Sequence, residues 1–239
     1  MFNMQQEDLF KRYSRQIFMD EIGLEGQKKI MASKILVIGA GGLGSPVIQY
    51  LAAAGVGTIG IADFDQVELH NLNRQIIHTE NEVGALKIRS AEKFVKNLNR
   101  QVKVKGIEQK IGAANVSEIL SQYDIIVDGS DNFLTRYLVN DTCVAMDKTL
   151  VYGSILGFSG QVAVFNHHGS KNLRDIFPEP PFDEELPDCD SLGVLGALPG
   201  IVGSMMALQT LKIITDLPVN INQLTLIDTL NWRFQTLDF

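Results

Sequence analysis

The sequence predicts an α/β fold: a Rossmann-like, doubly wound sheet that is mixed, with a parallel N-terminal part and an antiparallel C-terminal part. Short apolar segments alternate with helical segments, and the first of them, at 34–38, leads into the glycine turn Gly39–Gly44. Nearly continuous apolar strands separated by helices are typical of a parallel sheet covered on both faces. The antiparallel part is predicted by the alternating pattern of residues 158–165.

In chain order, the expected elements begin with two helices, at 6–19 and 24–31, where apolar residues recur at helical spacing. Strands and helices then alternate. The parallel strands are expected at 34–38, 58–62, 102–107, 125–127 and 150–153. The helices between them are expected at 43–54, 86–99, 116–120 and 133–146.

The pattern changes after Ser154. Residues 224–227 and 233–237 are expected to form a hairpin that, with 158–165, makes the sheet mixed. A proline- and acid-rich stretch lies between, and we expect 167–193 to be a crossover loop near the active site, because long loops in compact domains are commonly functional. The apolar residues 194–206 contain four glycines or prolines, which predicts a buried loop-to-helix segment.

Length and composition bound the class of protein. The 239 residues contain no Pro/Ser-rich linker, so we expect one domain over 1–239, with N-terminal helices at 1–33, a core at 34–154 and a mixed-sheet part at 155–239. The net charge of −7 argues against a broad nucleic-acid or anionic-membrane surface. Two cysteines, no apolar signal region in 1–20 and no apolar run of about 20 residues make the reducing cytoplasm the expected location.

The glycine turn predicts nucleotide binding by the core. Gly39 permits a tight strand-to-helix turn, Gly41 and Gly42 let the backbone approach phosphate, and Gly44 allows close packing of helix on strand. The helix that follows presents its N-terminus to an anion. Asp63 ends the next strand 24 positions after Gly39, close to the offset expected for a carboxylate on the ribose hydroxyls. The alternative is a purely structural turn.

Further polar residues favour phosphate chemistry over hydride transfer. Asn71 and Arg74 lie on a loop beyond the carboxyl end of the second parallel strand, Lys87 begins the next helix, and Asp131 follows the fourth strand on the same side. A triphosphate cleaved between its α and β phosphates benefits from several cations and a magnesium ion, which Asp131 could contact. Taken singly, Arg74 is also compatible with a surface salt bridge, Lys87 with a solvated first-turn residue and Asp131 with a helix N-cap.

Other reactive side chains carry less information. From helical pattern alone, Arg15 is an exposed charge. The histidines show no metal-ligand spacing and are expected in loops or at the surface; they are His70, His78, His167 and His168. Cys143 stands on an apolar helix face and is expected to be a buried small hydrophobe.

Five motifs, in order along the chain, resemble those of one family. They are Arg12-Tyr-Ser-Arg-Gln16, Gly39-Ala-Gly-Gly-Leu-Gly-Ser-Pro46, Asp63-Phe-Asp-x-Val67, Asn71-Leu-Asn-Arg-Gln75 and Asp128-Gly-Ser-Asp-Asn-Phe133. From about Phe10 to the C-terminus the chain is similar to ThiF/MoeB/HesA-type adenylyltransferases, which resemble ubiquitin-activating enzymes.

The resemblance implies a homodimeric adenylyltransferase that uses ATP and Mg²⁺. Its substrate would be the C-terminal glycine carboxylate of a ubiquitin-like sulfur carrier, ThiS-like or MoaD-like with a Gly-Gly end, in thiamine or molybdopterin biosynthesis. Residues 1–239 would then be a single adenylation domain, with 155–239 binding the carrier. No membrane or nucleic-acid partner is expected.

The resemblance also implies roles for individual residues. Arg15 would reach the phosphates of the neighbouring subunit. Asp63, with Asp65 in the same motif, would bind the ribose side of the nucleotide. The residues expected at the phosphates are Asn71, Arg74 and Lys87, with Asp131 holding the magnesium. The attacking group is the carrier's own carboxylate, so catalysis would rest on positioning and charge neutralisation.

The chain departs from many relatives in one respect. They carry two C-x-x-C pairs that bind a structural zinc, whereas here the first position is Lys171–Arg174 and the chain ends at Phe239 without a second pair. We therefore expect no zinc, and apolar or salt-bridge contacts holding the loop. Cys189 matches a loop cysteine that some relatives use as a nucleophile, although Asp188 and Asp190 would raise its thiol pKa; a covalent role stays open.

Three other functions compete with this one. An NAD-dependent oxidoreductase could use the same glycine turn, but it leaves Arg74, Lys87 and Asp131 without a role. A superfamily enzyme that adenylates a carboxylate on tRNA is disfavoured by the net charge and by the Arg12–Gln16 motif. A non-catalytic binding module is disfavoured because every phosphate-facing position is retained.

Overall fold

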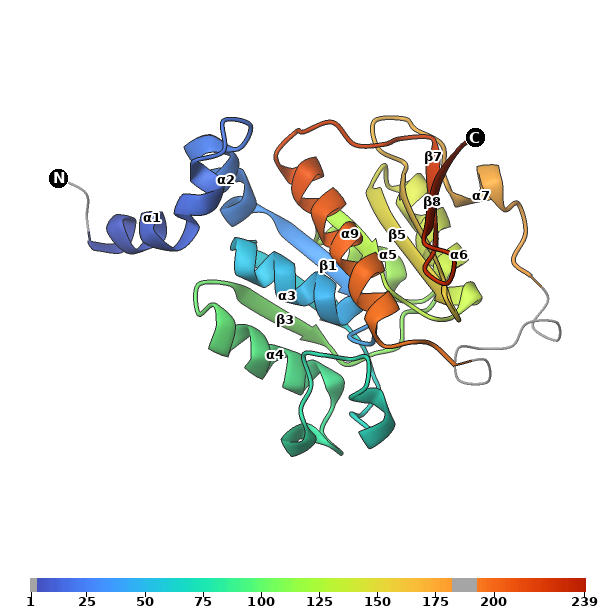
Figure 1. Ribbon diagram of the computed structural model, residues 1–239, viewed down its shortest axis with the longest axis horizontal. Helices are drawn as coiled ribbons and strands as arrows, with labels where there is room; N and C mark the ends of the chain where they lie inside the picture. The colour runs from blue at the N-terminus through green and yellow to red at the C-terminus, as the bar shows by residue number, and fades with distance from the viewer. Residues whose placement is uncertain (1–3, 182–192) are drawn as a thin grey trace.

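One mixed sheet runs through the molecule. The computed structural model describes residues 4–181 and 193–239, and in these parts eight strands pair in the order β3-β2-β1-β4-β5-β6-β7-β8 (Figure 1). Neighbours from β3 to β5 are parallel and those from β5 to β8 antiparallel, which confirms the predicted mixed sheet. The strands are β1 Lys34–Ile38, β2 Thr58–Ala62, β3 Lys103–Ile107, β4 Ile125–Asp128, β5 Thr149–Leu156, β6 Ser159–Phe165, β7 Gln223–Asp228 and β8 Arg233–Asp238.

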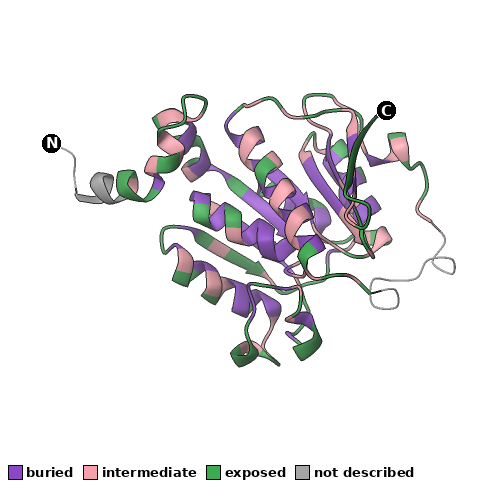
Figure 2. Ribbon diagram, in the orientation of Figure 1, coloured by how far each residue is buried: buried purple, intermediate pink, exposed green. Residues whose placement is uncertain are grey.

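Helices cover both faces of the sheet. α3, α4 and α9 pack on one face, and α5 and α6 on the other. The helices are α1 Met4–Ile17, α2 Gly23–Ala32, α3 Gly44–Ala54, α4 Lys87–Leu98, α5 Val116–Ser121, α6 Phe133–Ala145, α7 Leu173–Ile176 and α9 Ala197–Ile214, with 3₁₀ turns η1 Leu69–Asn71 and η2 Glu80–Glu82. Figure 2 shows the buried residues along the sheet and the inner sides of these helices.

The apolar strands follow from this layering. Successive side chains of a strand point to opposite faces. Ile35 and Val37 of β1 therefore enter the core under α3 and α9, whereas Leu36 and Ile38 enter the core under α5 and α6. Because both faces of this strand are covered by helices, every position points into a core and apolar residues do not alternate with polar ones. The sequence therefore shows a continuous apolar run.

The expected element bounds differ from the observed ones mainly at β5. This strand was expected at 150–153 but spans Thr149–Leu156, because it continues in antiparallel pairing with β6 after its parallel pairing with β4 ends at Tyr152. The expected crossover loop contains the short helix α7, and its residues 182–192 lie outside the described residues. The division of the chain into three parts stays a prediction.

The order of the strands reverses between β1 and β4. The chain moves from β1 outward through β2 to β3, then returns to add β4 and β5 on the other side of β1. Open α/β sheets bind ligands at such a reversal, outside the carboxyl ends of the two strands. The loop that follows β1 is the glycine turn, and the loop that follows β4 consists of residues 129–132.

Replacing Gly44 by alanine should destabilise the fold. A Cβ atom there would lie 1.9 Å from the backbone oxygen of Gly39. The strand-to-helix turn would have to open, and we expect the free energy of unfolding in urea to fall by about 3 kcal/mol. Gly112→Ala is the matched control, since nothing lies within 4 Å of its Cβ; equal stability of the two variants would contradict the close packing.

Candidate active site

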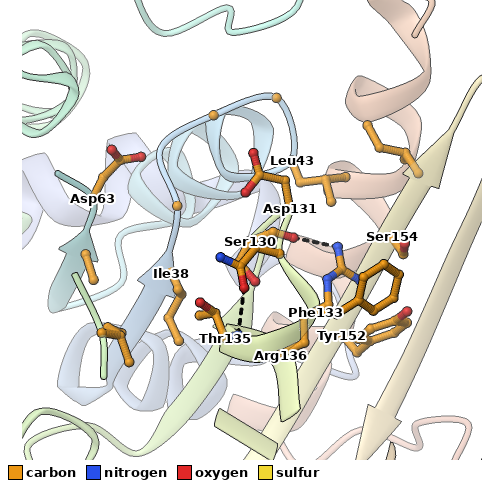
Figure 3. A pocket seen from close by; sticks show the side chains of 18 of the residues that line it. Ile38, Leu43, Asp63, Ser130, Asp131, Phe133, Thr135, Arg136, Tyr152 and Ser154 are labelled. Atoms are coloured by element: carbon orange, nitrogen blue, oxygen red, sulfur yellow. Dashed lines mark hydrogen bonds between the residues drawn. The ribbon is translucent and has the colours of Figure 1, made fainter. Parts of the chain in front are cut away.

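A cavity of about 790 Å³ lies at the reversal of strand order. Its walls come from the glycine turn, from the loops after β2, β3 and β4, from the first turns of α6 and from β5 (Figure 3). Cavities of roughly 300–1,000 Å³ are the usual size for small-molecule sites. The cavity therefore has the position and the volume of a nucleotide site.

The glycine turn is held by Asp63. Gly39 has φ +88°, a left-handed conformation that favours glycine. The Ala40 N–H donates to Asp63 Oδ2 at 2.8 Å, and the Asp65 N–H donates to Asp63 Oδ1 at 2.9 Å. The carboxylate predicted to hold the ribose thus also ties the end of β2 to the turn. Gly39, Gly41, Gly42 and both aspartates line the cavity.

Two cations from the β2–α4 region reach the cavity. Lys87 is 7% exposed, and its Nζ lies 2.9 Å from Asp65 Oδ2. The Arg74 guanidinium donates through one nitrogen to the carbonyl of His70 at 3.1 Å and to Asn73 Oδ1 at 3.2 Å. Both side chains line the cavity together with the glycine turn. Lysine and arginine are the side chains that bind phosphate groups in proteins, so these two cations stay the predicted phosphate ligands.

Asp131 enters from the opposite wall. It lies exposed in the loop after β4, lines the cavity, and points its carboxylate toward the glycine turn (Figure 3). The N-cap of α6 is Asn132, whose Oδ1 accepts from the Thr135 N–H at 2.9 Å. The alternative that Asp131 serves as the cap is therefore wrong.

Three expected site residues do not line the cavity. Gly44 lies behind the turn, at the start of α3. Asn71 is 5% exposed, and its Oδ1 accepts from the Glu68 N–H at 3.0 Å, which caps η1. Arg15 is exposed on α1, which extends away from the sheet (Figure 1). Direct phosphate roles for Asn71 and Arg15 stay predictions.

Two buried residues lie near Asp131, and the sequence predicted no role for either of them; Asp128 was noted only as part of a motif. Asp128 is fully buried; burial raises the pKa of its carboxyl, while the nearby Arg136 charge lowers it by a smaller amount. Arg136 is 5% exposed and donates to the carbonyl of Ser130. No pattern marked Arg136, because an arginine one turn into a helix is usually a surface residue.

His78 lies in a loop, as expected, and its side chain is 5% exposed. Its Nε2 lies 2.9 Å from the carbonyl of Ala40 and its Nδ1 2.7 Å from Ser90 Oγ. Because a carbonyl only accepts, Nε2 carries the proton, and the neutral ring joins the glycine turn to α4. Burial lowers the pKa of this histidine, and the nearby Lys87 charge lowers it further. The hydrogen bond to the Ala40 carbonyl raises the pKa, but by less than burial lowers it.

The crossover segment is attached to α6 by polar contacts. Arg174 makes a bidentate ion pair with Asp141 of α6, at 2.7 and 2.8 Å, which matches the salt-bridge contact expected for this segment. The absence of zinc stays a prediction. The Tyr137 hydroxyl lies 2.9 Å from the Phe177 carbonyl. Within residues 4–181 and 193–239, no three His, Cys, Asp or Glu side chains gather as metal ligands.

The two cysteines differ in what the structure says of them. Cys143 is fully buried, and burial raises the pKa of its thiol to about 12, which confirms it as a packing residue. Cys189 falls outside the described residues, so its nucleophilic role stays a prediction.

The fold and the site define an α/β protein whose cavity, at the reversal of strand order, combines a glycine turn with the side chains of Arg74 and Lys87. The chain belongs to the ThiF family, whose model matches residues 13–239. It is 50% identical over 203 residues to "Adenylyltransferase and sulfurtransferase MOCS3" of Culex quinquefasciatus, covering 85% of this chain and 46% of that protein. The chain thus spans just under half the length of that relative.

A shorter relative and two solved structures extend the comparison. The "Sulfur carrier protein adenylyltransferase" of Thermus thermophilus is 47% identical over 208 residues, covering 85% of this chain and 77% of that protein. A crystal structure of E. coli MccB superposes with a TM-score of 0.85 at 18% identity, over 99% of this chain and 71% of MccB. A crystal structure of PaaA superposes with a TM-score of 0.84 at 19% sequence identity, over 100% of this chain and 76% of PaaA. These two show the same fold.

Stability should fall at acidic pH through His78. Folding lowers the pKa of His78 below its ordinary value of 6.5, because the folded protein disfavours the protonated ring. Through this group, the folded state is therefore most stable above pH 6.5, and its free energy of unfolding decreases as the pH falls below that value. We expect the urea midpoint of the wild type to decrease between about pH 7.5 and 5.5 more steeply than that of His78→Gln. His70→Gln, at an exposed histidine, is the control and should keep the wild-type slope. Equal slopes for the wild type and His78→Gln would contradict this role.

Proposed function

We propose that this chain is an ATP-dependent adenylyltransferase that activates the C-terminal glycine carboxylate of a ubiquitin-like sulfur-carrier protein. The observation that carries the proposal is the meeting of Lys87, Arg74 and Asp131 around the glycine turn in one cavity. A dinucleotide needs one anion site at the helix N-terminus, whereas this cavity adds two cations and an exposed carboxylate. The names of the relatives, which are adenylyltransferases, support the same reaction.

The reaction needs positioning and charge, and the lining residues supply both. The carrier carboxylate attacks the α-phosphorus of ATP, the bond to the bridging oxygen breaks, and pyrophosphate leaves with that electron pair. Lys87 and Arg74 would neutralise the charge that grows on the departing phosphates. Asp63 would accept from the ribose hydroxyls while it holds the turn. No protein nucleophile takes part in this step.

A magnesium ion fits the residues present. Asp131 offers an exposed carboxylate beside the phosphate-binding turn, and magnesium prefers one or two carboxylates together with phosphate oxygens. When bound, the ion would draw negative charge from the phosphates. The contribution of Asp131 is to hold a carboxylate at that place.

The cavity continues away from the glycine turn along β5. Tyr152, Ser154 and Gln161 line this arm, and Phe177 and Val194 close it beside the crossover segment. We expect the extended end of a carrier, whose terminal glycines have no side chains, to lie along these residues. The net charge of −7 and the T. thermophilus relative's name favour a protein carrier over tRNA.

A homodimer would complete the site. Arg15 is exposed on α1, away from the cavity of its own chain. Helix α9 is long and apolar enough to span a membrane by composition, yet it packs on β5, β6 and α3. Leu208 of α9 is 58% exposed, and Tyr50 of α3, the helix that packs on α9, is 48% exposed. A second copy covering these two side chains would account for a helix that is apolar all round.

The function is tested by ATP–pyrophosphate exchange. We expect exchange that depends on one carrier with a Gly-Gly end, and the carrier that works separates the thiamine from the molybdopterin role. Lys87→Met should lower kcat/KM by about 100-fold or more, because a buried cation at the phosphates is lost. Lys93→Met, on an exposed face of the same helix, should stay within about twofold. Exchange with no carrier despite ATP binding would overturn the proposal.

The trans role of Arg15 is tested by complementation. Arg15→Ala and Asp131→Asn should each be inactive as homodimers. In a mixed dimer, one site would combine an intact Asp131 with an intact Arg15 from the partner, so co-expression should restore about a quarter of wild-type exchange. If Arg15 acts within its own chain, the mixed dimer has no intact site and stays inactive.

A further inference from the structure

Arg136 is a buried charge that the proposed reaction does not use. It lies one turn into α6 and is 5% exposed; its charge acts on the nearby Asp128 carboxyl, but among the described residues no carboxylate lies within ion-pair distance of it. Its guanidinium carbon lies 5.2 Å from the ring centre of Tyr152 and 5.8 Å from that of Phe133. Burying a charge without an ion pair is costly, so the arrangement needs another explanation.

The backbone of Ser130 is bound on both sides. Its N–H donates to Asp128 Oδ1 at 2.9 Å, and its carbonyl, which belongs to the peptide that joins Ser130 to Asp131, accepts from the Arg136 guanidinium. These two buried side chains hold the two peptide units that flank the Ser130 Cα atom. The aromatic rings beside Arg136 keep its plane fixed, as cation–π contacts do.

Asp131 is the next residue after Ser130. Its carboxylate points to the glycine turn, whereas the Arg136 guanidinium approaches the loop from the other side (Figure 3). A rotation of the Ser130 carbonyl would rotate the following residue and move the carboxylate away from the phosphates. The direction of Asp131 therefore depends on the bond that Arg136 makes.

The buried polar atoms at this point are not fully satisfied. Within the part of the chain that the structure describes, one nitrogen of Arg136, Asp128 Oδ2 and Ser130 Oγ are buried without a hydrogen-bond partner. Leaving such atoms buried lowers the stability of the folded state, which a fold tolerates where the arrangement serves a function.

We propose that Arg136 is a positioning residue that sets the Asp131 carboxylate for the magnesium ion of the ATP complex. The inference rests on the proposed function in one respect, namely that the nucleotide is bound with magnesium near Asp131. Arg136 contacts neither the nucleotide nor the carrier in this role. It acts through the Ser130 carbonyl.

The test is calorimetric titration with ATP, once in EDTA and once with magnesium, without any carrier. In the wild type, magnesium should tighten ATP binding. Arg136→Lys keeps the charge but loses the planar guanidinium, and Arg136→Met loses both; each should reduce the magnesium-dependent tightening by about 10-fold. Binding in EDTA should stay within about twofold of wild type, which also reports a folded site. Leu134→Ala, at an exposed residue of the same helix, is the control and should change neither value.

A double-mutant cycle completes the test. Asp131→Asn should remove the magnesium-dependent tightening, and adding Arg136→Met should remove no more, because both act through one carboxylate. The assignment would be overturned if magnesium tightened ATP binding to Arg136→Lys as much as to the wild type. It would also be overturned if the Arg136 variants lost as much ATP affinity in EDTA as in magnesium, or if the losses of Asp131→Asn and Arg136→Met were additive. An effect on the KM for the carrier alone would also overturn it. Failure of carrier-dependent exchange would leave these titrations unaffected, so the two proposals fail separately.

Discussion

The contact between two glycine-containing loops is the constraint on which the site depends. A Cβ atom on Gly39 would lie 3.0 Å from the carbonyl oxygen of Gly129, and one on Gly129 would lie 3.2 Å from the Gly44 nitrogen. The loops after β1 and β4 therefore touch through their backbones. Only this approach brings Asp131 from one loop beside the anion-binding turn of the other, and it requires both the parallel pairing of β1 with β4 and the absence of side chains between them.

Buried charges hold the loops around this contact. Asp63 ties β2 to the glycine turn, and Lys87 brings its charge to the cavity beside Asp65. On the opposite side, Asp128 and Arg136 hold the backbone of Ser130. In the proposed reaction, a site preorganised in this way would reorganise little when charge develops on the phosphates, and such preorganisation would be the main source of catalysis because the protein supplies no nucleophile.

Sequence reasoning predicted what depends on local pattern and motif spacing. The mixed sheet and the order of its elements followed from apolar strands and from the alternation at 158–165. The cavity position followed from the glycine turn and from Asp63, Lys87 and Asp131. Contacts that form only in the folded chain have no sequence pattern from which to predict them. The bond from Arg136 to the Ser130 carbonyl depends on how α6 meets the loop after β4, and the burial of His78 depends on its contact with Ala40 in the glycine turn. Asn71 was placed at the phosphates by its motif, but its side chain caps a local turn.

The central claim is that this cavity transfers an adenylate to a carrier carboxylate. Intact-mass analysis of ThiS-like and MoaD-like carriers, each incubated with the protein, ATP and magnesium, tests it most directly. The account predicts that one carrier gains the mass of one adenylate and that hydroxylamine removes it, as expected of a mixed anhydride. Carriers that keep their mass while the protein binds ATP, or an adenylate found instead on tRNA, would contradict it.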